Sequence, residues 1–440
     1  MSVLGPLLRA RRERPVFVAS AIALLAVLLT YPLVDAWLRA QGIAAPVRPI
    51  DLGAYYGAVK RWMVGDPLYV RTDAGGFHGS YLYPPVALLL FRPLVMLPFR
   101  TIHLVWGAAG LFVLWVGVQA AATALGADLH PLERLGLLPL CLGFAPVLLG
   151  LKMGQTAPLL AGLLALSLWA LLRGAQLDGR RGWAARLASG GLTAVVCVIK
   201  PAYAPVAAHL LADRDRLLGG ALTLVVATAL SLLVFGVETH RTYLDVLAWG
   251  LGGGGIVPPP IRWVPPYFRP LYPVRGQALV LRLAGSALVA GTAVALGRAD
   301  RGRGGLASAD GDAYGRLAPA GADDRLAFAL GVVAMPLLTP IAYAYYLAAV
   351  LPAAFVLLAD ELARGGAGHP LVVVGALACL QIHSQVMRLI IRGLPEIGTA
   401  VTALLQPGLW GVAALVGLAA LRAGQRLDAT RPWKGLAATG

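Results

Sequence analysis

The sequence predicts an all-α integral membrane protein that crosses the bilayer many times. Of its 440 residues, 58% are hydrophobic and only 13% are charged, whereas soluble domains carry about 25% charged residues. The mean hydropathy is correspondingly high, at +0.74. Apolar runs long enough to span a bilayer, about 20 residues, recur from one end of the chain to the other. We therefore treat residues 1–440 as a single membrane domain.

Eight apolar runs each predict one membrane-spanning helix. They cover about residues 16–38, 101–126, 134–150, 156–173, 217–237, 277–297, 370–391 and 401–421. Two longer runs, 187–211 and 326–358, are broken by proline at Lys200-Pro201 and at Thr339-Pro340. Proline lacks a backbone N–H and interrupts a helix, so we expect each long run to form two short helices that meet at a turn. The total is about twelve transmembrane helices.

The apolar run 84–98 is short and contains Arg92 and Pro93. We expect it to lie along the membrane surface or dip into it, as part of a first extracytoplasmic loop, 39–100, that carries surface helices. With this assignment the arginine-rich segments, including the flexible loop 298–325, fall on one side of the membrane. Short loops rich in Lys and Arg mark the cytoplasmic side, so both termini are expected there. No cleavage site follows the first apolar run, which we expect to stay in the mature chain.

The opposite side of the membrane receives the loops 39–100 and 238–276. These loops are rich in Asp, Tyr, Trp, Gln, Gly and Pro. A run of four glycines followed by three prolines in the second loop suits either a lid that orders on substrate or a plain connector. Because residue types suited to chemistry collect on this side, we expect the functional site at the extracytoplasmic face.

Several functional classes are disfavoured by composition. The net charge is +16, but it comes mainly from arginines in short loops between apolar runs, which is how a membrane protein fixes its orientation. We therefore expect no nucleic-acid partner. The three cysteines lie in separate apolar runs and the histidines are scattered, so neither type has the spacing of metal ligands. We expect core thiols, no metal and no cofactor.

Asp51 is the leading candidate for a catalytic residue. In a helix beginning at this position Tyr55 shares its face, and a carboxylate beside an aromatic ring can bind a sugar and accept a proton from an attacking hydroxyl. Asp is also a favoured N-cap, so Asp51 either caps a surface helix or acts as a base. Asp66 and Asp73 lie in the same loop and are weaker candidates.

Two breaks in apolar sequence supply further candidates. Lys152 and Gln155 flank a glycine turn, where a cation and an amide could meet an anion at a helix end; a tight turn with a snorkelling lysine is the other reading. Lys200 is the only charge in a long apolar stretch. An ionisable residue there indicates function by default, in this case contact with a phosphate, although a structural ion pair is the alternative.

Cations and aromatic residues alternate near the predicted outer interface. Arginines can hold a phosphate with two hydrogen bonds, and tyrosines belong either to an interfacial belt or to the wall of a site. The substrate-binding candidates outside the two breaks are Tyr55, Tyr56, Arg262, Arg269, Arg275, Gln277, Tyr345 and Tyr346.

Several motifs occur in an order that resembles glycosyltransferase family 87. They are Asp51 to Tyr56, Tyr83-Pro84-Pro85, Gly154-Gln155, Ile199-Lys200-Pro201, Gly276-Gln277 and Leu338 to Tyr343. This is a family of integral membrane glycosyltransferases of the GT-C fold, and it includes the mycobacterial mannosyltransferase that extends phosphatidylinositol mannosides. Each motif alone is unspecific, but together they cover most of the chain.

The resemblance implies an inverting transferase that takes a sugar, with mannose the leading candidate, from a polyprenyl-phosphate donor on the extracytoplasmic face. The acceptor would be a hydroxyl of a lipid or polysaccharide, and the protein would reside in the bacterial cytoplasmic membrane among membrane lipids. Asp51 falls where the family has its catalytic base. Lys200, Gln155 and an arginine of the outer loop suit the leaving phosphate, which they could stabilise without a metal.

The chain also departs from the family pattern. Ala278 follows Gln277 where the family often has serine, and Tyr345-Tyr346 stands where the family often has histidine. A tyrosine can hydrogen-bond like a histidine but does not share its protonation near neutral pH, so the sugar and the acceptor can differ from those of the mannosyltransferase. Two other readings are a lipid or sugar transporter or flippase, and a catalytically inactive scaffold of the same fold.

Overall fold

The computed structural model describes residues 14–42, 48–71, 76–77, 81–251, 267–268, 277–306, 322–339, 342–364, 367–393 and 399–429. Its helices are α2 (Pro15–Ala40), α3 (Ile50–Met63), α4 (Phe99–Ala124), α5 (Pro131–Gly143), α6 (Ala145–Met153), α7 (Ala157–Gln176), α8 (Gly179–Ile199), α9 (Arg214–Leu251), α10 (Ala278–Leu306), α11 (Ala322–Leu338), α12 (Val350–Ala363), α13 (Pro370–Gly393), α14 (Thr399–Leu404) and α15 (Pro407–Asp428). Four 3-10 helices are η1 (Pro85–Leu90), η2 (Arg92–Met96), η3 (Pro201–Ala212) and η6 (Ala344–Ala349), and two short strands are β1 (Tyr267–Phe268) and β2 (Ala342–Tyr343).

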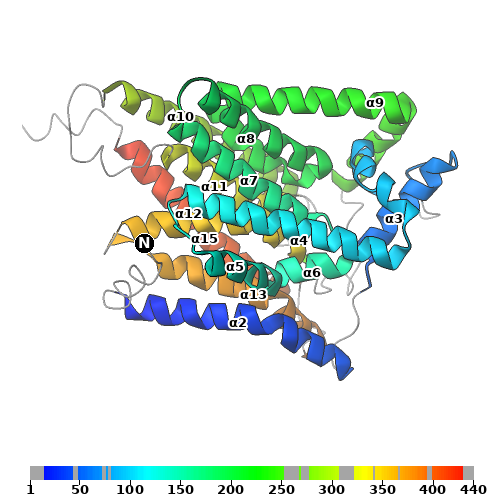
Figure 1. The fold of residues 1–440 in the computed structure, drawn as a ribbon, viewed down its shortest axis with the longest axis horizontal. Coiled ribbons are helices and arrows are strands. Elements are labelled where there is room, and N and C mark those ends of the chain that lie inside the picture. The colour runs from blue at the N-terminus through cyan, green and yellow to red at the C-terminus, as the bar shows by residue number, and fades with distance from the viewer. Residues whose placement is uncertain are drawn as a thin grey trace, which may run out of the picture.

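The long helices lie side by side in one bundle, and the N-terminal end of α2 lies at the opposite end of the bundle from α3 (Figure 1). Nine helices of the described part are long and apolar enough to cross a membrane, or ten if the bent pair α5–α6 is one span. The predicted all-α polytopic class is thus confirmed. The other two segments counted among the predicted crossings are η3 and α11, which are shorter.

The chain breaks at Lys200, as the sequence predicts, and this break reverses its direction. Gly190 of α8 lies against the carbonyl of Arg216, while Ala194 lies near Gly220. Contacts that advance together along both helices mean that α8 and α9 run parallel, so the chain must return between them. The twelve residues of η3 make that return, over about 24 Å at the rise of a 3-10 helix. The first segment, however, is a full helix of 21 residues and not a short one.

The predicted single helix over 134–150 is wrong. The chain is bent by 69° between α5 and α6, at Phe144, because Pro146 has no N–H to continue the helix. The side-chain amide of Gln381 on α13 repairs the break. It donates to the Gly143 carbonyl at 3.0 Å and accepts from the Ala145 N–H at 2.7 Å. Backbone groups freed inside a membrane protein need such partners because no water is present.

Three other predicted boundaries shift, whereas the run 84–98, which is not expected to span the membrane, forms no spanning helix. The run 84–98 forms η1 and η2, which are too short to cross a bilayer and contact α3 and α9. Helix α9 continues beyond its break at Gly236 to Leu251, so the loop predicted over 238–276 starts later. Helix α10 extends to Leu306, inside the predicted loop 298–325. The predicted helix 401–421 is interrupted near Gln406, before Pro407 starts α15.

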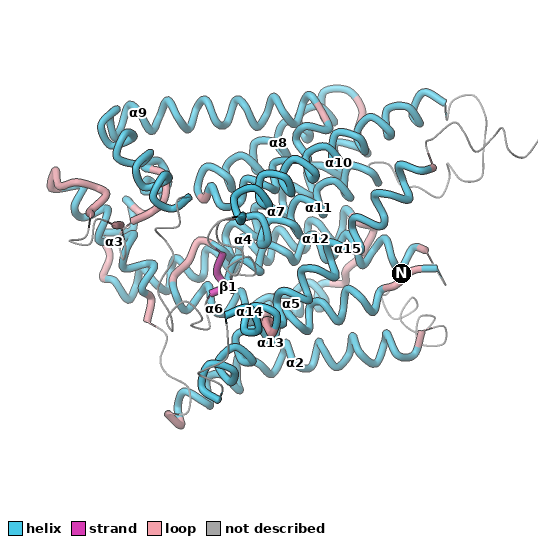
Figure 2. Tube along the Cα trace, turned by 180° about the vertical axis from the view of Figure 1, so that it is seen from behind, coloured by secondary structure: helices cyan, strands magenta, loops and turns pink. Residues whose placement is uncertain are grey.

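The bundle has two chemically different ends. One is the Lys200 end, where α6 and α8 stop and η6 begins. The other carries ion pairs whose arginines are buried, among them Arg216 with Asp324 at 2.6 Å and Arg422 with Glu361 at 2.5 Å. Of the helices long enough to cross a membrane, α7 and the segment formed by η6 and α12 are the most enclosed. Figure 2 shows β1 in the view from behind, and its partner strand β2 directly precedes η6.

Candidate active site

Gly154 brings the chain to the centre of the candidate site. It ends α6 in the left-handed conformation, with φ of +68°, which glycine adopts without steric cost. A Cβ at this position would also collide with the side chain of Leu52 on α3. The glycine therefore turns the chain toward α7 and at the same time lets α3 approach, which places Gln155 beside Asp51.

Gln155 is the hub of the site, and it is only 3% exposed. Its amide oxygen accepts hydrogen bonds from Lys200 Nζ at 3.0 Å, Tyr55 Oη at 3.2 Å and Tyr83 Oη at 3.4 Å. Its amide nitrogen donates to Tyr345 Oη at 3.1 Å. The indole N–H of Trp106 donates to its backbone carbonyl at 3.3 Å. Four segments of the fold are thereby joined through this side chain, and a fifth, α4, is joined to its backbone.

Lys200 lies in a cage of aromatic rings and is 1% exposed. Its Nζ is 4.1 Å from the ring centroid of Tyr346 and 5.1 Å from those of Tyr83 and Tyr345. Ring faces attract a cation, but burial of a charge is costly without an anion. Burial lowers the pKa of Lys200 at this turn outside the helices, and Asp51 opposes that shift.

Asp51 supplies the negative charge of the site. It lies in the first turn of α3, where Pro49 is the N-cap and no side chain caps the helix, so the capping interpretation of Asp51 is wrong. Its Oδ2 atom is buried and has no hydrogen-bond partner among the described residues. Burial raises the pKa of Asp51 above its ordinary value, while Gln155 and Lys200 act in the opposite direction.

Tyrosine and phenylalanine rings enclose this charged pair. Tyr55 stacks on Phe91 at 4.4 Å and meets the edge of Tyr83 at 5.2 Å. The ring of Tyr345 stacks on Tyr343 at 5.1 Å. Pairing of β1 with β2 matches Tyr267 with Tyr343, which fixes the chain just before η6. The result is a carboxylate with one buried oxygen, a buried cation and an amide, surrounded by rings.

The structure brings some of the predicted site residues together and places others elsewhere. The structure brings Asp51, Tyr55, Gln155, Lys200, Tyr345 and Tyr346 together. Arg262, Arg269 and Arg275 lie outside the described residues.

Two predicted substrate-binding residues make contacts elsewhere, and a third is exposed. Lys152 pairs with Asp35 on α2, on the other side of α6. Tyr56 contacts Phe99 and lies under Lys60. Gln277 is exposed just before α10.

Tyr83 and Trp106 were not among the predicted site residues. The signal for Tyr83 is the pair of prolines that follows it, because Tyr83-Pro84-Pro85 fixes an extended turn before η1. Trp106 lies inside the apolar run of α4, where nothing in the local pattern distinguishes it from an ordinary core residue.

A carboxylate that can take a proton and a cation that can meet a phosphate therefore lie at the same end of the bundle. No curated protein matches the chain. The sequence model of glycosyltransferase family 87 matches residues 81–310, which is more than half of the chain and includes Tyr83, Gln155 and Lys200. Asp51 precedes the matched region, so its place in the site comes from the structure. On this match, the chain belongs to glycosyltransferase family 87.

Proposed function

We propose that this glycosyltransferase is an inverting enzyme that moves a sugar from a polyprenyl-phosphate donor to a hydroxyl of a lipid or polysaccharide acceptor. The observation that carries the proposal is the buried Asp51 Oδ2, which has no partner among the described residues, beside the buried charge of Lys200. A free carboxylate oxygen can receive a proton, and a buried cation can hold a phosphate.

The proposed step is a single displacement. Asp51 takes the proton of the acceptor hydroxyl as its oxygen bonds to the anomeric carbon of the sugar. The bond between that carbon and the phosphate oxygen breaks, and the electron pair leaves with the phosphate. Attack from the face opposite the leaving group inverts the anomeric centre. Asp51 ends protonated, and the lipid phosphate carries the released charge.

Lys200 and Gln155 are assigned to the leaving phosphate. Lys200 Nζ now bonds the Gln155 amide oxygen at 3.0 Å, an uncharged partner that a phosphate oxygen can replace with a stronger, charge-assisted bond. The hydroxyl groups of Tyr83 and Tyr345, which also bond this amide, are further donors at the same point. These groups stabilise the leaving charge, so the proposal includes no metal and no other cofactor.

The proposal includes mannose as the leading donor sugar and the extracytoplasmic face of a bacterial cytoplasmic membrane as the location of the site. The arginine-rich segments support this orientation. Arg216, Arg325 and Arg422 all lie at the end of the bundle opposite Lys200, and basic segments mark the cytoplasmic side. The Lys200 end then faces outward, where lipid-linked rather than nucleotide-linked sugars are the available donors.

The transporter and scaffold readings receive less support. The charged and polar groups of the site collect at one end of the bundle and not along a path through its middle. The site also keeps both a carboxylate and a cation, which an inactive scaffold has no need to bury, since burying charges is costly.

The test is sugar transfer from a panel of radiolabelled polyprenyl-phosphate sugars to a membrane glycolipid fraction. We expect transfer by the wild type and a loss of about a hundredfold or more in Asp51→Asn. Asp66→Asn is the matched control, because Asp66 is an exposed carboxylate beyond the end of the same helix. Equal transfer by Asp51→Asn and the wild type would remove Asp51 from the mechanism.

A further inference from the structure

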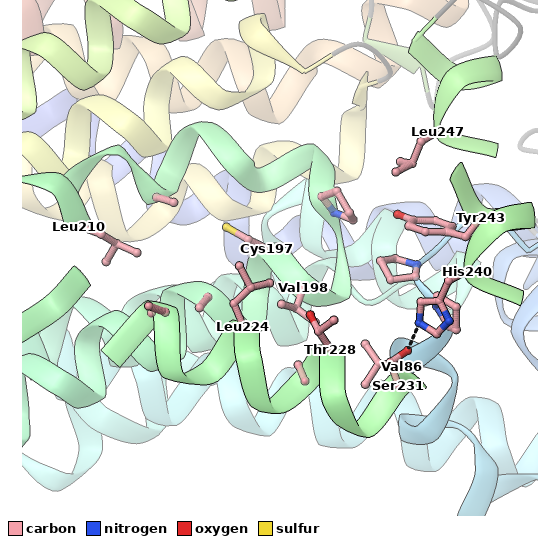
Figure 3. A pocket seen from close by; sticks show the side chains of 18 of the residues that line it. Val86, Cys197, Val198, Leu210, Leu224, Thr228, Ser231, His240, Tyr243 and Leu247 are labelled. Atoms are coloured by element: carbon pink, nitrogen blue, oxygen red, sulfur yellow. Dashed lines mark hydrogen bonds between the residues drawn. The ribbon is translucent and has the colours of Figure 1, made fainter. Parts of the chain in front are cut away.

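An apolar groove leads away from the candidate site. It is a cavity of about 500 Å³ between α8, η3 and α9, with η1 at one end (Figure 3). Most of its walls are Ala, Val, Leu and Pro side chains, such as Val198 and Leu224. The lining residues of α9 extend from Leu217 to Leu247, and the straight part up to Ser231 alone measures about 21 Å at the helical rise.

One end of the groove adjoins the Lys200 cage, and one side is open. Pro84 and Pro201 line the groove, and each directly follows a residue of the cage, Tyr83 or Lys200. Leu224, which forms part of the outer rim, is 55% exposed on a helix long and apolar enough to cross the membrane. A lipid chain can therefore enter sideways from the bilayer, with its head next to Lys200.

Tyr243 brings a polar group into this apolar groove. The residue is 9% exposed, and its hydroxyl is buried without a hydrogen-bond partner in the described part of the chain. Figure 3 shows the ring reaching in from α9 with its oxygen directed toward the other lining residues. Its ring stacks on Tyr69, which donates to the Tyr83 carbonyl at 2.7 Å. Tyr243 is thus held beside the segment that carries Tyr83.

Two buried or partly buried polar residues near Tyr243, His240 and Ser231, already have partners. His240 contacts the Gly236 carbonyl at 2.7 Å through Nδ1 and Ser231 Oγ at 2.8 Å through Nε2. These bonds join the two sides of the break in α9 at Gly236. A buried hydroxyl left without a partner costs about 1–3 kcal/mol, and the Tyr243 hydroxyl is therefore the group of the groove that is suited to a ligand.

We infer that the groove binds the apolar chain of a phosphate-headed lipid and that Tyr243 donates a hydrogen bond to an oxygen of its phosphate. This inference rests on the proposed function, because it assigns the groove to the lipid of the sugar donor. Lys200, which directly follows α8, and Tyr243 on α9 then meet the head from different parts of the fold, while the chain lies along both helices. Tyr243 is a substrate-binding residue in this arrangement, and the groove determines which lipids the enzyme accepts.

The test measures binding, which does not depend on transfer. A long-chain polyprenyl phosphate, a prenyl phosphate of one isoprene unit and the uncharged long-chain polyprenol are titrated against the purified protein in detergent. Ala227→Phe fills the groove. We expect this variant to bind the long-chain phosphate about tenfold or more weakly than the wild type and to bind the short-chain phosphate with unchanged affinity. Val226→Phe is the matched control, because Val226 is exposed on α9 and does not line the groove.

Tyr243→Phe tests recognition of the lipid head separately from recognition of its chain. We expect both phosphates to bind about tenfold more weakly and the polyprenol to bind as before. Unchanged binding of both phosphates to Tyr243→Phe, or of the long-chain phosphate to Ala227→Phe, would overturn the inference while leaving the proposed function standing. If the folded wild type binds no polyprenyl phosphate, or prefers an ordinary diacyl phospholipid in the groove, the donor assignment fails as well.

Discussion

The amide oxygen of Gln155 accepts a hydrogen bond from Lys200 Nζ at 3.0 Å, and this contact joins two interruptions of otherwise apolar helices. Gln155 follows the glycine that ends α6, and Lys200 follows the end of α8. Interrupted helices expose backbone and side-chain polar groups together, and such backbone is tolerated at membrane depth where protein or a cavity surrounds it. The two breaks therefore bring these polar groups together inside otherwise apolar helices.

Replacement of Lys200 should change the pH dependence of transfer. Burial raises the pKa of Asp51, and Lys200 opposes that shift. A base must be deprotonated, so activity falls as the pH drops through its pKa. Lys200→Gln removes the opposing charge and should move this acidic limb to higher pH, besides lowering kcat. The measurement is kcat/KM against pH.

The control for this experiment is Lys60→Gln. Lys60 is an exposed lysine of α3 over the ring of Tyr56, and its removal subtracts the same charge from the protein. It should leave the acidic limb in place. An acidic limb at the same pH in Lys200→Gln and the wild type would show that Lys200 does not act on the base.

Substitution of Gly154 should damage both stability and activity. An alanine in the left-handed region costs about 1–2 kcal/mol, and its Cβ would also push against Leu52, which moves α3 and the carboxylate of Asp51. Gly65→Ala is the matched control, because Gly65 has φ of +83° with nothing near its Cβ position. The midpoint temperature of thermal unfolding in detergent should be lower for both variants. The rate of sugar transfer should fall only for Gly154→Ala.

The membrane class and the central residues of the site were predictable because hydropathy and isolated charges are local properties of sequence. Lys200 stands out as a lone charge next to a proline, and Asp51 as an acid in a polar segment. The bend at Phe144 was not predictable from hydropathy, since Pro146 lies within an unbroken apolar run. Its repair depends on Gln381, more than two hundred residues away in sequence.

Pairings between distant side chains explain the remaining errors. Lys152 lies three positions before Gln155 and seemed equally suited to an anion, but it turns to Asp35 of α2. A lysine near the end of a helix can reach either side, and the sequence does not indicate where the acid lies. Tyr83 was missed for the reverse reason, since only the fold shows that its hydroxyl meets Gln155.

Tyr345 should contribute to transfer through its hydroxyl. Its Oη accepts from the Gln155 amide nitrogen at 3.1 Å, which orients the amide oxygen toward Lys200. Tyr345→Phe removes this acceptor and should lower kcat about tenfold, the effect of one lost hydrogen bond of about 1.4 kcal/mol. Tyr56→Phe is the control, since Tyr56 contacts Phe99 instead. Equal kcat in Tyr345→Phe and the wild type would contradict this role.

Removal of the Gln381 amide should destabilise the bend that directs α6 toward the site. Gln381→Leu leaves the Gly143 carbonyl and the Ala145 N–H without their side-chain partner, at a cost of about 1–3 kcal/mol for each group. Gln119→Leu is the control, because the amide of Gln119 bonds a carbonyl of its own helix. Thermal unfolding in detergent should show a lower midpoint for Gln381→Leu alone. Sugar transfer measured at a temperature well below that midpoint should fall as well, because α6 leads the chain to Gly154 and Gln155 in the site. Full activity of Gln381→Leu at that temperature would mean that the bend keeps its direction without Gln381.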